Sequence, residues 1–297
     1  MSAITPDPNH SLAPSGNLRR RMMISRTFVS ATVVAAGLAV AVLGILVYYA
    51  GYHGASQLSF TFLTAQLPAI GLSSGGGMGP ALAGTAEVVL IGTAIALPVG
   101  ILTAIYLSEF ASRRIGNVLT TALELMSGLP TIIAGAFAVA LLVERNGQSA
   151  YAAGLALSIV EVPLIARATI ESLRRVPGSL REAADALGVA HWRTVLGVIL
   201  PTASNGILTA TILAVARAAG ETAPVLLTMN AFGQAYQLNP AHAMPTIPME
   251  LLTLLNSGQP SALDQAWGAA FLLMILILVV NIGARVWLRR SERKRGL

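Results

Sequence analysis

Five ionisable residues lie within apolar segments of this sequence: Glu124, Glu161, Arg167, Arg217 and Glu221. Placing such a residue at the centre of a bilayer costs roughly 2.5–3.5 kcal/mol, so residues of this kind usually have a function. Arg217 and Glu221 are four residues apart and would share one face of a helix. A guanidinium matches the paired oxygens of an oxyanion, and a neighbouring carboxylate would weaken its hold on the ion. The pattern predicts an anion path through Arg217 and Glu221, with Arg167 as a further candidate.

The same residues also have a structural interpretation. Arg217 and Glu221 could form an ion pair that only neutralises itself, and Arg167 could extend its side chain to the membrane surface. Glu124 and Glu161 fit hydrogen-bonding or helix-packing groups better than path residues. Straight helices would place Arg217 toward the outer half of its span and Arg167 near the inner end of the preceding one.

The composition excludes several kinds of chemistry. The chain has 297 residues, of which 55% are hydrophobic and 11% charged, and its mean hydropathy is +0.70. A soluble domain has roughly 25% charged residues, so the solvent of this chain must be mostly lipid. The sequence has no cysteine, which excludes disulfides, cysteine-ligated metals and thiol nucleophiles. Its only lysine, Lys294, lies near the end of the chain, which excludes a Walker A phosphate loop and a lysine Schiff base within the membrane.

These exclusions leave no cofactor or metal that we expect this chain to bind. The net charge of +6 does not indicate a nucleic-acid partner, because the basic residues flank apolar runs and form no separate patch. The four histidines are far apart in the sequence and give no metal-binding pattern.

Six apolar runs are long enough to cross a bilayer as helices. The first is too long for the apolar part of a signal peptide, which has about 7–15 residues, so we expect it to be retained. The sequence therefore predicts an all-α membrane protein with six transmembrane helices, at residues 27–50, 81–108, 118–143, 150–171, 198–222 and 265–288.

The distribution of basic residues supports this topology with both termini in the cytoplasm. Of the 19 lysines and arginines, only Arg145 falls in an outer segment, and Arg167 and Arg217 fall within spans. An excess of basic residues in inner segments is the usual signature of orientation. The remaining 16 would all lie inside: Arg19, Arg20, Arg21, Arg26, Arg113, Arg114, Arg174, Arg175, Arg181, Arg193, Arg285, Arg289, Arg290, Arg293, Lys294 and Arg295.

The expected organisation is a disordered basic cytoplasmic tail (1–26), a six-helix membrane domain (27–288) with an inner loop at 172–197, and a basic cytoplasmic tail (289–297). The outer segment 223–264 has five prolines between apolar stretches. It predicts a short interfacial helix or a segment that dips into the membrane.

The inner loop after the fourth span contains a short amphipathic helix at SLREAADALG, residues 179–188. Ser179 and Glu182 have the spacing of a capping box, and Gly188 suits a left-handed helix end. Leu180, Ala183, Ala184 and Leu187 share one face, and an apolar face on the cytoplasmic side needs a partner to cover it. The alternative is a helix that lies on the membrane or on its own bundle.

This loop resembles the docking loop of permeases from binding-protein-dependent ABC importers, whose motif is EAA-x3-G-x9-I-x-LP. The matching residues are Glu182, Ala183, Ala184, Gly188, Leu200 and Pro201, with Val198 in place of the isoleucine. Five further stretches resemble the PstA-type permeases of phosphate importers. They are GPALAGT (79–85), ALPVGILTAIYLSEFA (96–111), LPTIIAG (129–135), PLIARATIESLRRVP (163–177) and ARAAGETAPVLLT (216–228).

The resemblance implies a six-helix bundle of the type I ABC importer permeases, located in the plasma (inner) membrane, with a cytoplasmic coupling helix. It implies transport of inorganic phosphate and a role for intramembrane arginines in anion passage, which favours Arg217 most. It also implies three partners: a pair of ATP-binding subunits that use ATP and magnesium, a second related permease and an extracytoplasmic phosphate-binding protein. The chain itself would not be an enzyme. A permease for another oxyanion such as molybdate or sulfate, a polytopic membrane enzyme and a channel without an ATPase remain alternatives.

Overall fold

The computed structural model describes residues 16–66, 76–229 and 235–295, and the regular structure within these ranges is entirely helical. The chain divides into two compact units, Met1–Tyr52 and His53–Leu297. Five helices are long and apolar enough to cross a membrane, and a bent helix pair makes a sixth span if it is counted as one. The predicted all-α membrane fold is confirmed.

A single helix, α1 (Gly16–Gly54), forms the described part of the first unit and ends just inside the second. Its apolar residues are distributed all around the helix, as in a span surrounded by lipid or by other helices. The prediction of a disordered tail over 1–26 is wrong for residues 16–26, which are helical. This stretch follows the last proline of the tail and is rich in Arg and Met, which are good helix formers. Residues 1–15 lie outside the described ranges.

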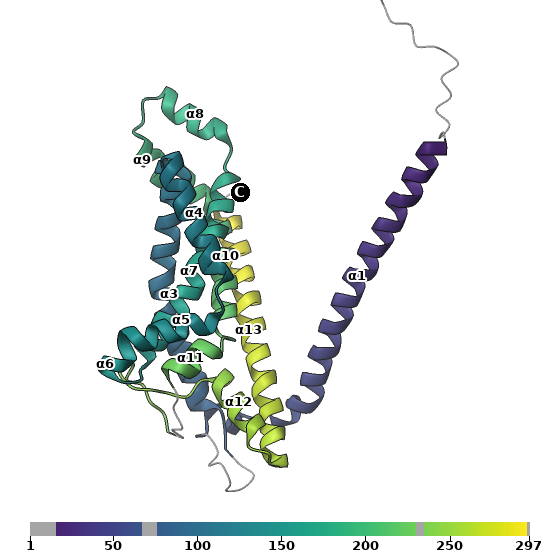
Figure 1. The fold of residues 1–297 in the computed structure, drawn as a ribbon, viewed down its shortest axis with the longest axis vertical. Helices are drawn as coiled ribbons and strands as arrows, with labels where there is room; N and C mark the ends of the chain where they lie inside the picture. The colour runs from purple at the N-terminus through teal and green to yellow at the C-terminus, as the bar shows by residue number, and fades with distance from the viewer. Residues whose placement is uncertain (1–15, 67–75, 230–234, 296–297) are drawn as a thin grey trace, which may run out of the picture. The chain divides into compact units, whose positions relative to one another are not determined.

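The second unit contains the remaining elements. In Figure 1, α8, α9 and the C-terminus lie at one end of this unit, and α6, α11 and α12 lie at the other. The elements are η1 (Ala55–Gln57), α2 (Phe60–Thr64), α3 (Gly79–Ile105), η2 (Tyr106–Phe110), α4 (Arg113–Gly128), α5 (Thr131–Ala138), η3 (Val139–Val143), α6 (Glu144–Asn146), α7 (Ala150–Arg174), α8 (Gly178–Ala186), α9 (His191–Thr194), η4 (Val195–Ile199), α10 (Leu200–Ala218), α11 (Ala223–Thr228), α12 (Ile247–Asn256) and α13 (Pro260–Arg295).

The predicted third span, 118–143, is broken rather than straight. Helix α4 ends at Gly128, and the chain continues as α5 and α6 at 99° to it. Leu129 and Pro130 between them have extended backbone conformations, with ψ of 135° and 132°. Proline lacks the N–H that a continuous helix would need, and it also disfavours the helical conformation of the residue before it. The break therefore follows from Pro130.

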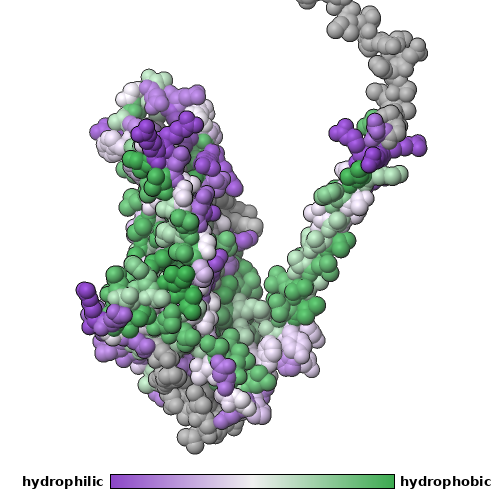
Figure 2. All heavy atoms as spheres, in the orientation of Figure 1, coloured by the Kyte–Doolittle hydropathy of each residue, from purple (hydrophilic) through white to green (hydrophobic). Residues whose placement is uncertain are grey.

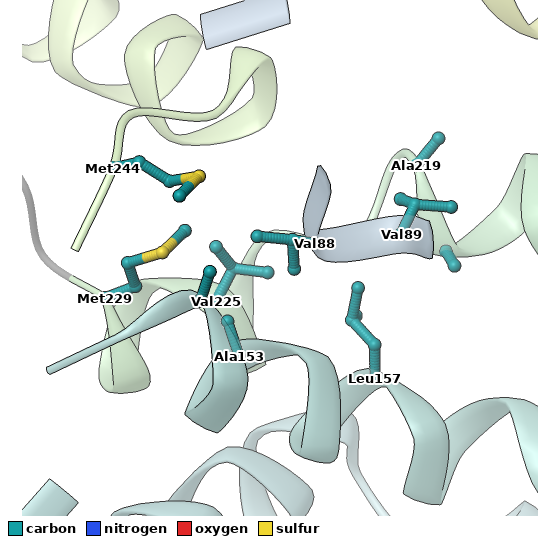
Figure 3. Packing of buried hydrophobic residues seen from close by; sticks show 10 residues of the cluster. Val88, Val89, Ala153, Leu157, Ala219, Val225, Met229 and Met244 are labelled. Atoms are coloured by element: carbon teal, nitrogen blue, oxygen red, sulfur yellow. The ribbon is translucent and has the colours of Figure 1, made fainter. Parts of the chain in front are cut away.

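Helices α3 and α7 pack closely because small residues line their contact. A Cβ atom on Gly92 would lie 3.0 Å from the Cβ of Leu157 and 3.2 Å from the carbonyl oxygen of Gly154. Small residues let membrane helices approach in this way. Val88 and Leu157 continue the contact into an apolar cluster toward the α11 end (Figure 3), where other helices and the outer segment add Ala219, Val225, Met229 and Met244.

The outer segment is attached to this core by hydrogen bonds. The Thr85 hydroxyl of α3 donates to the Ala81 carbonyl at 2.7 Å and accepts from the Ile247 N–H of α12 at 2.9 Å. The Ala150 N–H at the start of α7 donates to the His242 carbonyl at 3.2 Å. Helix α12 is a short apolar helix within this segment, for which the sequence predicted a short interfacial helix or a stretch that dips into the membrane.

Polarity changes along the second unit. Figure 2 shows hydrophobic side chains over the middle of the unit and hydrophilic ones gathered at the α8 end. The α8 end is where α3 ends, α4 begins and the α7–α10 connection lies, so Arg113, Arg114, Arg174, Arg175 and Arg181 all belong to it. Arg145 lies on α6, at the other end.

Candidate functional site

Two of the predicted path residues, Arg167 and Arg217, line one cavity of about 410 Å³ between α7 and α10. Its other walls are mostly apolar: Leu164, Ala168 and Glu171 from α7, and Ala210, Leu213 and Ala214 from α10. The cavity has room for roughly a dozen waters at about 30 Å³ each. It therefore holds two arginines and the carboxylate of Glu171 among apolar residues, in a space large enough for a small hydrated anion.

The two arginines occupy successive levels of this cavity. Arg217 and Leu164 of α7 both line a second, smaller cavity of about 50 Å³, so they lie at the same level. Arg167 follows Leu164 by three residues along α7. Three helical residues correspond to about 4.5 Å. The predicted difference in depth is therefore small enough for both long side chains to reach the same space.

Arg217 and Glu221 form the predicted pair, with a different local geometry. Helix α10 ends at Ala218, so Glu221 lies in the following turn and not on the same helix face. The Arg217 Nε is 3.5 Å from the Glu221 Oε1, and the side chains are 57% and 15% exposed. An ion pair this long and this open leaves most of the guanidinium donors available to another partner.

The smaller cavity connects Arg217 to the broken span. It is lined by Leu129, Pro130 and Thr131 at the bend between α4 and α5, and by Pro163 of α7. The bend therefore brings the start of α5 next to Arg217. A continuous helix through residues 118–143 would not turn toward α10 at this point.

The two remaining intramembrane carboxylates are separate from this cavity. Glu161 of α7 is buried, and its Oε2 accepts a hydrogen bond of 3.0 Å from the Thr93 hydroxyl of α3. Its Oε1 has no partner among the described residues. The prediction that Glu161 is a hydrogen-bonding group between helices is confirmed. Glu124 is exposed on α4 and does not line either cavity.

The predicted docking helix is present as α8, with one error at its start. The helix begins at Gly178 with Pro177 as its N-cap, and no side chain caps it, so the predicted capping box of Ser179 and Glu182 is wrong. A Ser179 cap would make Leu180 the first helical residue, but the helix already begins at Gly178, directly after Pro177. At the other end, Gly188 has φ of +68°, and this confirms the left-handed cap.

Helix α8 and the turn after it present apolar side chains at the end of the unit. Leu187 is 82% exposed and Trp192 is 53% exposed. Glu182 and Ala183 are also exposed, whereas Ala184 is buried against the bundle. The helix therefore packs on its own unit through one side and leaves the other side uncovered.

The last two motif residues do not belong to this exposed surface. Leu200 packs against the cluster around Leu173, Val195 and Ile199 at the α8 end of the bundle, and Pro201 begins α10. The structure thus brings four of the six predicted docking residues together and places Leu200 and Pro201 in the span that follows.

Sequence reasoning missed one carboxylate at this end of the molecule. Glu109, in the π-helical turn η2, is 4% exposed and lies 2.8 Å from the Arg181 Nη2 of α8 and 3.6 Å from the His191 Nε2 of α9. These residues are 72 and 82 positions apart in the sequence, so no local pattern links them. The only hint in the sequence was an acidic residue at the end of a predicted span, shortly before Arg113 and Arg114.

Comparison with known proteins identifies the family. Residues 96–296 match the family described as the binding-protein-dependent transport system inner membrane component. The chain is 36% identical to the phosphate transport system permease protein PstA 1 of Mycobacterium tuberculosis (strain ATCC 25618 / H37Rv), over 75% of this chain and 73% of that protein. It is 35% identical to a probable phosphate transport system permease protein PstA of Methanocaldococcus jannaschii, over 78% of this chain and 81% of that protein.

Solved structures agree on the fold. A chain of a bacterial alginate ABC transporter, in complex with an alginate-bound periplasmic protein, superposes with a TM-score of 0.61 at 15% identity, covering 92% of this chain and 96% of that one. A chain of the MetNI methionine ABC transporter in an inward-facing conformation has a TM-score of 0.55 at 19% identity, covering 72% of this chain and 93% of that one. At these identities the similarity establishes the architecture of an ABC importer permease and nothing about the substrate.

Proposed function

Because the chain belongs to the family of binding-protein-dependent transport system inner membrane components, we propose that it moves inorganic phosphate into the cytoplasm through the cavity of Arg167 and Arg217. Family membership makes the chain a multi-pass inner-membrane permease subunit of an ABC importer, with no catalytic site or cofactor of its own. It excludes the alternatives of a membrane enzyme and of a channel without an ATPase.

The choice of phosphate rests on the relatives and on the charge of the cavity. Phosphate carries one or two negative charges near neutral pH, and two guanidinium groups offer paired donors at fixed positions. Both arginine side chains are exposed, so their donors are accessible to an ion in the cavity. Relatives at 35–36% identity are named phosphate permeases.

Glu221 provides the means of release. Two arginines alone would hold a dianion too firmly for transport, since passage requires binding that is strong enough for entry and weak enough for exit. The Glu221 carboxylate, 3.5 Å from Arg217, competes for the same guanidinium. Together with Glu171 in the cavity wall, it offsets much of the positive charge of the two arginines. When the ion leaves, Arg217 returns to Glu221.

The proposed partners are those of the family, and the exposed ends of the second unit offer surfaces for them. A pair of ATP-binding subunits, which use ATP and magnesium, docks on α8 through Leu187 and Trp192 in the cytoplasm. An extracytoplasmic phosphate-binding protein delivers the ion to the opposite end, at the segment around α12. A second related permease completes the path, and both termini of this chain are cytoplasmic. ATP binding favours one conformation of the permease pair and hydrolysis restores the other.

The experiment is uptake of labelled phosphate by the complete complex in proteoliposomes with ATP inside. We expect uptake that requires ATP and the binding protein and that excess unlabelled phosphate suppresses, while equal sulfate and molybdate do not. Competition by sulfate or molybdate with an equal or lower half-inhibitory concentration would assign the permease to another oxyanion.

A further inference from the structure

Glu109 occupies an unusual position at the inner end of the bundle. It lies in η2, the turn that follows α3, at the end of the unit where α8 lies. Its side chain is only 4% exposed. A carboxylate with so little access to water must be compensated by cations or hydrogen-bond donors within the protein. The compensation comes from the two ends of the docking loop.

The first compensating residue is Arg181, in the first turn of α8. Its Nη2 and Nε contact the two carboxylate oxygens of Glu109 at 2.8 and 3.5 Å. Its Nη1 donates to the Val176 carbonyl at 3.1 Å, and its Nη2 also donates to the Leu173 carbonyl at 3.3 Å. The Leu173 carbonyl lies in the last turn of α7, and the Val176 carbonyl lies in the connection between α7 and α8. One guanidinium therefore joins the ends of α3 and α7 to the start of α8.

The second contact comes from His191, at the start of α9 beyond the loop, which adds a positive charge beside Glu109 only when it is protonated. Its Nε2 donates to the Glu109 backbone carbonyl at 3.1 Å and lies 3.6 Å from the carboxylate. The Phe110 ring packs edge-on against the imidazole, with ring centres 5.2 Å apart. Glu109 and Phe110, which follow α3, thus contact the docking loop at its beginning, through Arg181, and at its end, through His191.

We propose that Glu109 is a positioning residue for energy coupling, which makes α8 move together with α3 and α7. The inference rests on the proposed docking of the ATP-binding subunit on α8. We call Glu109, Arg181 and His191 the Glu109 cluster. With the cluster intact, a displacement of α8 by the ATP-binding subunit displaces the ends of both spans. Without it, α8 keeps its packing on α9 and η4 but loses its side-chain connection to the ends of α3 and α7, so it can move independently of these two helices.

The same end of the molecule provides a matched control. Arg174 forms an ion pair with Glu171 at 3.2 Å, but both side chains are more than half exposed, at 71% and 61%. Pairs this exposed contribute little, whereas removing one partner of a buried pair leaves the other uncompensated. Arg181→Gln and Arg174→Gln are therefore the same chemical change, made once in a buried pair and once in an exposed pair.

The test compares Glu109→Gln, Arg181→Gln, their double variant and Arg174→Gln in the complete complex in proteoliposomes. Three quantities are measured: copurification of the ATP-binding subunit, ATP hydrolysis, and phosphate taken up per ATP hydrolysed. We expect all variants to retain the ATP-binding subunit and to hydrolyse ATP. Uptake per ATP should fall at least fivefold in Glu109→Gln and Arg181→Gln, fall no further in the double variant, and stay within twofold of wild type in Arg174→Gln.

Non-additivity distinguishes a shared function from two separate structural defects. Losses that multiply in the double variant, or unchanged uptake per ATP in both single variants, would overturn the inference while leaving the docking proposal intact. If the wild-type chain does not copurify with the ATP-binding subunit, the docking proposal fails and the inference fails with it. These two failures are therefore separable.

A milder variant covers the case in which Glu109→Gln does not reach the membrane. His191 is 45% exposed, so His191→Ala removes one contact of the cluster without burying a charge. We expect normal assembly, a loss of two- to threefold in uptake per ATP, and faster backbone hydrogen exchange in residues 178–190 with unchanged exchange in α3. Exchange rates and coupling equal to those of wild type would contradict the proposal.

Discussion

Replacing Arg217 with glutamine distinguishes an anion site from a structural ion pair. The Arg217 Nε is 3.5 Å from Glu221, and the Arg217 side chain is 57% exposed, so the pair contributes at most about 1 kcal/mol to folding. Hydrogen bonds to a charged group are worth roughly 1.5–3 kcal/mol each, so losing two bonds to phosphate would cost roughly 3–6 kcal/mol. Exposure to water favours the lower end. We therefore expect about a 100-fold loss of uptake at sub-saturating phosphate, at about 1.4 kcal/mol per tenfold change, with normal amounts of the protein in the membrane.

The companion variants make the test specific. Arg217→Lys keeps the charge but loses the planar fork, so we expect a loss of about tenfold, between that of wild type and glutamine. The double variant Arg217→Gln with Glu221→Gln removes both charges and should remain inactive, because it restores no anion site. Arg145→Gln, at an exposed position on α6, is the control and should leave uptake unchanged. Near-normal uptake by the double variant would refute the reasoning and make the pair structural.

Three further predictions concern docking, topology and pH. Gly188→Val forces a β-branched residue into a φ of +68°, at a strain of roughly 1–2 kcal/mol, and should lower ATP-driven uptake. The control Gly178→Ala, at a helical glycine with open space around it, should leave uptake unchanged. Equal uptake by the two variants would argue against the cap. In this cysteine-free chain, a cysteine at Gln259 should react with an impermeant thiol reagent on intact cells and one at Asp185 should not; labelling at Asp185 would invert the topology. Burial raises the pKa of Glu250 on α12 to about 7 from 4.5, so the fold favours the protonated form. That contribution is complete below pH 4.5 and is lost as the pH rises to about 7, by up to about 3 kcal/mol. Thermal unfolding of Glu250→Gln should lack this decline, and an identical pH dependence in both proteins would contradict the assignment.

The elements that could be predicted from the sequence are those whose signal is local. Apolar length gave the spans, and the left-handed cap at Gly188 follows from the conformational freedom of glycine alone. The predictions were wrong where a nearby proline determines where a helix begins or ends. Pro130 divides the third span because its ring constrains the residue before it, and Pro177 begins α8 ahead of the predicted Ser179 cap. Both prolines are visible in the sequence, but the direction of the 99° bend depends on packing against α7 and α11.

The candidate sites divide in the same way. The cost of a charge in lipid identified Arg167 and Arg217 as candidates, yet their shared cavity depends on how α7 crosses α10. Glu109 gave no such signal, because it lies at the end of a span, where a carboxylate can reach water and placing its charge has little free-energy cost. Only the fold brings it to Arg181 and His191, and a single sequence contains no information on pairs that are 72 and 82 residues apart.

The docking loop and the arginine cavity are connected by the shortest route that the fold offers. The loop with α8 joins α7 to α10, and these are the two helices that form the walls of the cavity. Glu171, at the α8 end of the cavity wall, is three residues from Arg174, where α7 ends, or about 4.5 Å along the helix. A helix transmits displacement along its axis with little deformation, because its backbone hydrogen bonds fix each turn to the next. We therefore expect a movement of α8 to change the separation of Arg167 and Arg217 without any contact between the ATP-binding subunit and the ion, provided that the Glu109 cluster makes the loop follow the spans.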